Sequence, residues 1–249
     1  MMHHLTALIA PFLTADYLWM ALVVIVGACL QGVGGIGFGM FVGPVLAILH
    51  QELVPGPVLF LSALISIMSA LREYRAIDFP ALGYALVGRV PASILASMTI
   101  AILPMRAMSI VFALLILIAI AMSLRGWRVT PGPRNYMFAG AASGFMGTIT
   151  SVGAPPMVIV YQDFSGPQVR ATLGVFFAVG CVISLIALAL FGRFGLAELN
   201  YGISLTVPMM VGFAASNMVV ARIKREHMRL LILAFSGCAA IVLLALQVA

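Results

Sequence analysis

Long apolar runs separated by short polar or charged stretches dominate the chain from about residue 17 onward. They predict ten helical segments, five in each half of the chain. In the first half we expect segments at residues 17–31, 36–49, 55–73, 79–102 and 105–124. In the second half we expect segments at residues 135–150, 153–162, 167–191, 199–222 and 227–248. Runs of this kind, without alternating short strands, predict an all-α polytopic membrane protein.

The first two segments of each half are shorter than the roughly 20 residues that a straight span needs. A glycine-rich stretch joins them, at residues 27–39 before Pro44 and at residues 140–153 before Pro156. Each glycine inside a helix costs about 1 kcal/mol relative to alanine. Such a stretch suits either close helix packing or a break with bare backbone. We therefore expect each half to begin with a broken or re-entrant helix pair.

The two stretches resemble copies of one another. A single offset places Gly32 on Gly144, Gly35 on Gly147, Pro44 on Pro156 and Pro55 on Pro167. Because each half has an odd number of segments, the second half enters the membrane from the opposite side, which predicts an inverted repeat. We expect a first transmembrane repeat at 17–124 and a second at 135–249, with an N-terminal segment at 1–16 and a cytoplasmic linker at 125–134.

Composition supports a membrane location. The chain is 63% hydrophobic and 8% charged, with a mean hydropathy of +1.19, whereas soluble domains carry about 25% charged residues. The net charge of +6 is better explained by basic loops that set orientation than by nucleic-acid binding. The three cysteines lie in apolar runs without metal-ligand spacing, so we expect no metal and no cofactor.

Basic residues follow the third, fifth and ninth segments. They are Arg72 and Arg75, then Arg125, Arg128 and Arg134, then Arg222, Lys224, Arg225 and Arg229. Placing these clusters in the cytoplasm puts both termini on the periplasmic side and leaves the lone Arg106 and Arg170 outside. The predicted orientation is the same whether each short pair forms two membrane spans or a re-entrant hairpin, because both return the chain to the side from which it entered.

These motifs resemble those of the TauE/SafE, or TSUP, family of membrane transporters. The resemblance rests on the two glycine-rich stretches, the prolines that follow them and the two-halves architecture, and it covers nearly the whole chain. It implies transport, chiefly export, of small anions such as sulfite, sulfonates or related organic acids across the bacterial inner membrane. The second stretch departs from the first, because it carries Thr148, Thr150 and Ser151 where the first has Ile36, Phe38 and Gly39.

The residues themselves point to an anion site. Paired, glycine-interrupted short segments in two halves indicate a midplane transporter site, and helix N-termini favour negative charge. Arg89 lies about 15 Å into its segment, where a charge is costly; it either neutralises an anion or snorkels to a headgroup. The candidate substrate-binding set is Gln31, Gly32, Gly34, Gly35, Gly37, Pro44, Arg89, Gly144, Gly147, Thr148, Thr150, Ser151 and Pro156.

Several alternatives stay open at this point. The Ser and Thr hydroxyls could instead bond to carbonyls of their own helix. His50 and Asp163 are candidates for proton coupling, or ordinary interfacial residues. The chain could be an anion channel or a membrane subunit without transport of its own; an enzyme is disfavoured, since no acid or histidine lies deep in a segment. Expected partners are a small anion and the lipid bilayer, and a homo-oligomer is compatible with the sequence.

Overall fold

The computed structural model describes residues 14–34, 37–127, 129–219 and 225–248. Every regular element in these ranges is a helix, which confirms the all-helical class. The first half contains α2 (Ala15–Gly34), α3 (Phe38–Leu49), η2 (Gln51–Leu53), α4 (Gly56–Arg72), η3 (Tyr74–Ala76), α5 (Phe79–Ile102) and α6 (Met105–Arg125). The second half contains α7 (Pro133–Thr150), α8 (Ala154–Val160), α9 (Gly166–Leu190), α10 (Leu196–Ser204), α11 (Thr206–Val219) and α12 (Arg225–Val248).

Four of the described helices are long and apolar enough to cross a membrane. These stretches are Ala15–Val33, Phe79–Ile102, Met105–Arg125 and Gly166–Leu190. Two helices of the glycine-flanked pairs are short, as expected: α3 has 12 residues and α8 has 7. The chain is therefore a polytopic membrane protein that combines full-length helices with short ones.

The first segment is longer than its expected bounds of 17–31. Helix α2 has 20 residues and continues through Gly27 and Gly32. A Cβ on Gly27 would overlap the side chain of Val42, and one on Gly32 would overlap Ser216. These glycines allow neighbouring helices to approach closely, so they serve packing inside the helix. The break itself comes later, at Gly37.

The expected segment at 199–222 is two helices within its described part, α10 and α11. They separate at Leu205. Pro208 has no N–H to offer the carbonyl of Ser204, so one helical hydrogen bond is lost there. The Tyr17 hydroxyl of α2 donates to that carbonyl instead, at 2.9 Å. Pro44 has a similar consequence in α3, because the carbonyl four residues earlier, that of Met40, accepts a hydrogen bond from Ser236 of α12.

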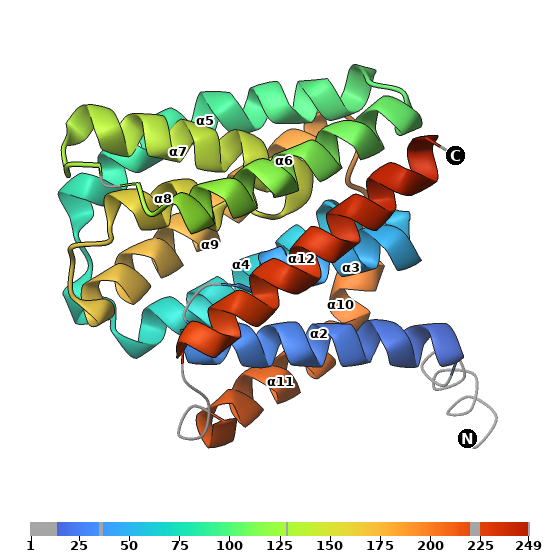
Figure 1. Ribbon diagram of the computed structural model, residues 1–249, viewed down its shortest axis with the longest axis horizontal. Coiled ribbons are helices and arrows are strands. Elements are labelled where there is room, and N and C mark those ends of the chain that lie inside the picture. Colours follow the sequence, from blue (N-terminus) through green and yellow to red (C-terminus); the bar gives the residue numbers. More distant parts are fainter. Residues whose placement is uncertain (1–13, 35–36, 128, 220–224, 249) are drawn as a thin grey trace.

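Helices from the two halves pack against one another. Helix α2 packs on α11, α7 on α5, α4 on α9 and α6 on α12. Helix α2 begins and α12 ends on the same side of the bundle, at the right of Figure 1. The first motif pair, α2 and α3, and the second, α7 and α8, enter the bundle from opposite sides (Figure 1).

Arg170 does not lie on the periplasmic side, to which the sequence analysis assigned it. Its guanidinium makes a bidentate ion pair with Glu73, with nitrogen–oxygen distances of 3.0 and 2.5 Å. Glu73 directly follows α4, beside Arg72. The expectation that Arg170 falls on the opposite side from the cluster after α4 is therefore wrong. The segment at 153–162 is the seventh, and odd-numbered segments end at this side, so the order of segments itself places Arg170 here: α8 returns the chain to this end of the bundle before α9 begins (Figure 1).

Candidate functional site

The chain breaks between α2 and α3 at Gly37. Gly37 has φ 140°, a backbone conformation that other residues rarely adopt. The N–H of Phe38, the first residue of α3, donates a 3.0 Å hydrogen bond to Oε1 of Gln31. The Gln31 side chain thereby satisfies one of the N–H groups that a helix start leaves without a helical partner. All three residues line one cavity.

The second break, between α7 and α8, is shaped by Thr150 and Ser151. Ser151 has φ 61°, and its N–H donates to the carbonyl of Gly147 at 2.8 Å. The Thr150 hydroxyl donates to the carbonyl of Met146 at 2.7 Å and accepts from the Val152 N–H at 3.0 Å. The single proton of the Thr150 hydroxyl is thus donated to a carbonyl of its own helix. This is the alternative to substrate binding that the sequence left open for these hydroxyls.

The two breaks meet in the middle of the bundle. A Cβ on Gly39, in the first turn of α3, would overlap the carbonyl oxygen of Ser151. A Cβ on Gly43 would lie only 2.7 Å from the carbonyl oxygen of Thr150. Backbone therefore packs directly on backbone, and the absence of side chains at these glycines allows it.

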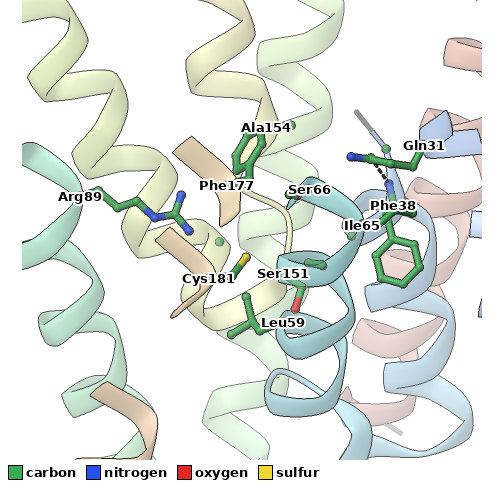
Figure 2. Close-up of a pocket in the computed structure, with 15 residues that line it drawn as sticks. Gln31, Phe38, Leu59, Ile65, Ser66, Arg89, Ser151, Ala154, Phe177 and Cys181 are labelled. Atoms are coloured by element: carbon green, nitrogen blue, oxygen red, sulfur yellow. Dashed lines mark hydrogen bonds between the residues drawn. The ribbon is translucent and has the colours of Figure 1, made fainter. Parts of the chain in front are cut away.

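A cavity of about 40 Å³ lies at this junction, which is room for a few water molecules. In Figure 2, Arg89 approaches the cavity from one side, and Gln31 and Phe38 lie on the other. Both halves of the chain contribute to its lining, which consists of Gln31, Gly37, Phe38, Gly39, Leu59, Ser62, Ile65, Ser66, Arg89, Gly147, Ser151, Gly153, Ala154, Phe177 and Cys181.

Arg89 supplies the positive charge of the cavity. Its side chain is only 1% exposed, so it does not snorkel to the surface. The guanidinium carbon lies 4.7 Å from the ring centre of Phe176 and 5.9 Å from that of Phe177, and Nη1 donates to the Ser143 hydroxyl at 3.2 Å. A Cβ on Gly180 would overlap Arg89 Nε, so this glycine of α9 leaves the space that the guanidinium occupies.

Unused hydrogen-bonding groups concentrate at this cavity. Within the described part of the chain, four buried side-chain polar atoms have no hydrogen-bond partner. Three of them belong to lining residues: Ser62 Oγ, Arg89 Nε and Ser151 Oγ. The lining includes no aspartate or glutamate. Two unpaired hydroxyls and an arginine without a carboxylate partner among the described residues are an arrangement that suits an anion with several acceptor oxygens.

Five of the expected substrate-binding residues line the cavity: Gln31, Gly37, Arg89, Gly147 and Ser151. The described residues that do not line it are Gly32, Pro44, Gly144, Thr148, Thr150 and Pro156, and no contact of Gly34 is described. Gly144 packs against the backbone of Arg89. The Thr148 hydroxyl is hydrogen-bonded to that of Ser184, at 2.7 Å. Gly35 lies outside the described residues.

The candidate coupling residues His50 and Asp163 lie away from the cavity. His50 follows α3, and its Nδ1 lies 3.3 Å from Oε1 of Glu52. Asp163 is exposed in the turn between α8 and α9. Neither residue lines the cavity, so their candidacy for coupling rests on the sequence.

Sequence reasoning missed Ser62 and Ser66 of α4, and Phe177 and Cys181 of α9. All four line the cavity. Ser62 and Ser66 are spaced four apart, so they share one face of an apolar helix, and that spacing was the available signal. They face the junction because of the way in which α4 packs on α9, and no local sequence pattern predicts that packing.

A second, larger hollow of about 740 Å³ lies where α5 ends and α6 begins. Its polar and charged lining residues are Gln51, Glu52, Ser109, Arg193 and Glu198. The hollow extends inward to Ile149 of α7, while the cavity is bordered by Gly147 and Ser151. The end of α7 therefore lies between the hollow and the cavity.

One of three comparisons with known proteins gives a match. A family model described as "Sulfite exporter TauE/SafE" matches residues 19–243, nearly the entire chain. No curated protein and no solved structure gives a significant match.

Proposed function

The chain belongs to the sulfite exporter TauE/SafE family, and from this premise we propose that it exports small anions such as sulfite, sulfonates or related organic acids by alternating access. Members of this family are membrane transporters and not enzymes, so the chain is a membrane transporter. The bacterial inner membrane is the location that this proposal requires.

The observation that carries the proposal is the buried charge of Arg89. A charge removed from water and left without an opposite charge costs several kcal/mol. Arg89 is 1% exposed, and no carboxylate of the described residues lies within ion-pair distance of it. An anion in the adjoining cavity would offset that cost, and the free hydroxyls of Ser62 and Ser151 would donate to its oxygens.

The first turn of α3 adds to the same preference. Gly37, Phe38 and Gly39 line the cavity at the N-terminal end of this 12-residue helix. The N-terminal end of a helix carries a partial positive charge and N–H groups without helical partners. The Phe38 N–H is used by Gln31, and the later N–H groups of that turn complement an anion near Arg89.

The helix pairings support an inverted repeat. If α2, α3, α4 and α6 correspond to α7, α8, α9 and α12, then α5 corresponds to α10 and α11. Under that correspondence the packing of α7 on α5 matches that of α2 on α11, and the α4–α9 and α6–α12 pairs map onto themselves. A pseudo-two-fold relation between the halves produces this pattern. Rocking of one half against the other about the junction is the motion that we propose.

The two ends of the bundle differ in a way that suits one step of such a cycle. The positive-inside rule, applied to Arg72 and Arg75 after α4, puts that end in the cytoplasm. There the Glu73–Arg170 ion pair joins α4 to α9. The 740 Å³ hollow lies at the opposite, periplasmic end. We therefore infer an arrangement whose cytoplasmic end is closed and whose periplasmic end is open as far as the end of α7, which separates the hollow from the cavity.

Transport by purified protein in liposomes tests the proposal. Efflux of sulfite, sulfate, taurine and acetate would be followed for the wild-type protein, Arg89→Ala and Arg89→Lys. We expect Arg89→Ala to lower the rate for the transported anion by at least tenfold, since a charge-assisted contact contributes about 1.5–3 kcal/mol. Arg134→Ala, an exposed arginine at the start of α7, is the matched control. No flux of any of these anions would contradict the proposal.

The flux rate separates a carrier from the alternative of an anion channel. A carrier that works by alternating access moves its bound anion once per conformational change and is therefore slower than a channel.

A membrane subunit without transport of its own would need no buried unpaired arginine, since close glycine packing alone would explain the two motifs. The buried guanidinium of Arg89 lines the cavity, and this observation favours a transporter over a subunit without transport of its own.

A further inference from the structure

Ser143 joins two parts of the site without lining the cavity itself. It lies in α7 and is 0% exposed. Its hydroxyl donates a 2.6 Å hydrogen bond to the carbonyl of Gly153, just before α8. The same oxygen accepts a 3.2 Å hydrogen bond from Nη1 of Arg89. One side chain therefore contacts both the buried cation and the second break.

The direction of both hydrogen bonds is fixed by chemistry. A guanidinium has only donors and a backbone carbonyl only accepts, so the single proton of the Ser143 hydroxyl must point to Gly153. Its lone pairs then face Arg89. Donation to the carbonyl also polarises the hydroxyl, which makes it a better acceptor for the charged N–H group.

Other contacts restrain Arg89 less specifically. The rings of Phe176 and Phe177 lie against the guanidinium but offer no directional acceptor. Arg89 Nε has no hydrogen-bond partner. Within the described part of the chain, Ser143 Oγ is the one hydrogen-bond acceptor of the guanidinium. The rotation of this group in its plane is thus set by Ser143.

We propose that Ser143 is a positioning residue for anion transport, which holds the Arg89 guanidinium at the cavity and ties it to the carbonyl of Gly153. The inference rests on the proposed function, because Arg89 must be the counter-charge of the anion. A cation held in place before the anion arrives loses little freedom on binding. The hydroxyl therefore raises anion affinity through Arg89, without touching the anion.

The test is sulfite binding to purified protein by calorimetry, with Ser143→Ala and Ser143→Thr. The alanine variant should bind sulfite about tenfold more weakly, and the threonine variant, which retains a hydroxyl, should recover most of the affinity. Ser97→Ala is the matched control, since Ser97 is also fully buried but bonds only to Ser93 of its own helix. Its affinity should equal that of the wild-type protein.

A double-variant cycle separates positioning from a general packing effect. In an Arg89→Ala background, Ser143→Ala should cause no further loss, because the group that it positions is gone. Wild-type affinity in Ser143→Ala, or an equal loss with and without Arg89, would overturn the inference. If the alanine variant does not fold, Ser143→Cys takes its place; the thiol is a weak acceptor of similar size, so affinity equal to the wild-type protein would again overturn it.

Failure of the proposed function gives a different result. If the wild-type protein and Arg89→Ala bind sulfite equally, or neither binds it, then Arg89 is not the counter-charge of the anion. That result would overturn both the proposed anion site and the positioning role of Ser143. If Arg89→Ala loses affinity while Ser143→Ala does not, the anion site stands and only the role of Ser143 is overturned.

Discussion

The backbone of Gly39 lies directly against the carbonyl oxygen of Ser151, so closely that a Cβ on Gly39 would overlap that oxygen. Gly39 lies in the first turn of the short helix after the first break, and Ser151 directly follows the helix before the second break. This one contact therefore brings the two glycine-rich motifs together. The cavity beside Arg89 exists because the motifs meet there without side chains between them.

The first prediction concerns this contact. Gly39→Ala should lower the melting temperature of the detergent-purified protein, since a backbone carbonyl cannot move aside cheaply and overpacking costs about 1–3 kcal/mol. The control is Gly83→Ala in α5, where a Cβ would meet nothing within 4 Å. That variant should be as stable as the wild-type protein or more so, because alanine favours helix. Equal melting temperatures for Gly39→Ala and the wild-type protein would show that the motifs do not touch.

The space beside Arg89 leads to a second prediction. A Cβ on Gly180 would overlap Arg89 Nε, and a side chain can shift more easily than backbone. Gly180→Ala should therefore weaken sulfite binding about tenfold with a smaller loss of stability. In the Arg89→Ala background the same substitution should have no effect on residual binding. Calorimetric titration of the four proteins checks both statements, and a loss that persists without Arg89 would contradict the reason given.

The two hydroxyls at the second break, those of Ser151 and Thr150, should differ in their effects on anion binding and on stability. Ser151 Oγ has no partner, so Ser151→Ala should leave the stability of the ligand-free protein nearly unchanged and weaken anion binding. Thr150 Oγ1 makes two hydrogen bonds, so Thr150→Ala should destabilise the protein by about 1–3 kcal/mol. Thermal unfolding with and without sulfite separates these effects. The opposite order of stabilities would contradict the assignment of roles.

The ion pair between Glu73 and Arg170 gives a prediction on conformation. Glu73→Gln removes the charge that joins α4 to α9, which should open the cytoplasmic end more often. Cys181 lines the cavity, so it should react faster with an impermeant thiol reagent added on that side, in a background without Cys29 and Cys238. Exchange of the two charges, Glu73→Arg with Arg170→Glu, should restore slow labelling. Unchanged labelling in Glu73→Gln would show that the pair does not close this end.

The sequence anticipated those features that depend on local chemistry. The break within the first motif, the short α3 and α8, and a charge deep in α5 all follow from glycine, proline and arginine at known positions. It misjudged the length of α2, because Gly27 and Gly32 fit against Val42 and Ser216 and so do not end the helix.

The features that the sequence did not predict depend on partners from distant segments. Ser143 matters because Arg89, 54 residues away, donates to it. Gly180 matters because the guanidinium occupies the space beside it. No pattern within α7 or α9 distinguishes these residues from other small residues in apolar helices. The Arg170–Glu73 pair, across 97 residues, was missed for the same reason.

The most direct test of the account is the stabilisation of the protein by a small anion through Arg89. Melting temperatures would be measured across a sulfite titration for the wild-type protein and Arg89→Gln, with dimethyl sulfone as an uncharged compound. We predict that sulfite raises the wild-type melting temperature in a saturable way, as binding to the folded state requires, and that dimethyl sulfone does not. Arg89→Gln should show no such rise, and an equal rise in both proteins would contradict the claim that this buried arginine makes the cavity an anion site.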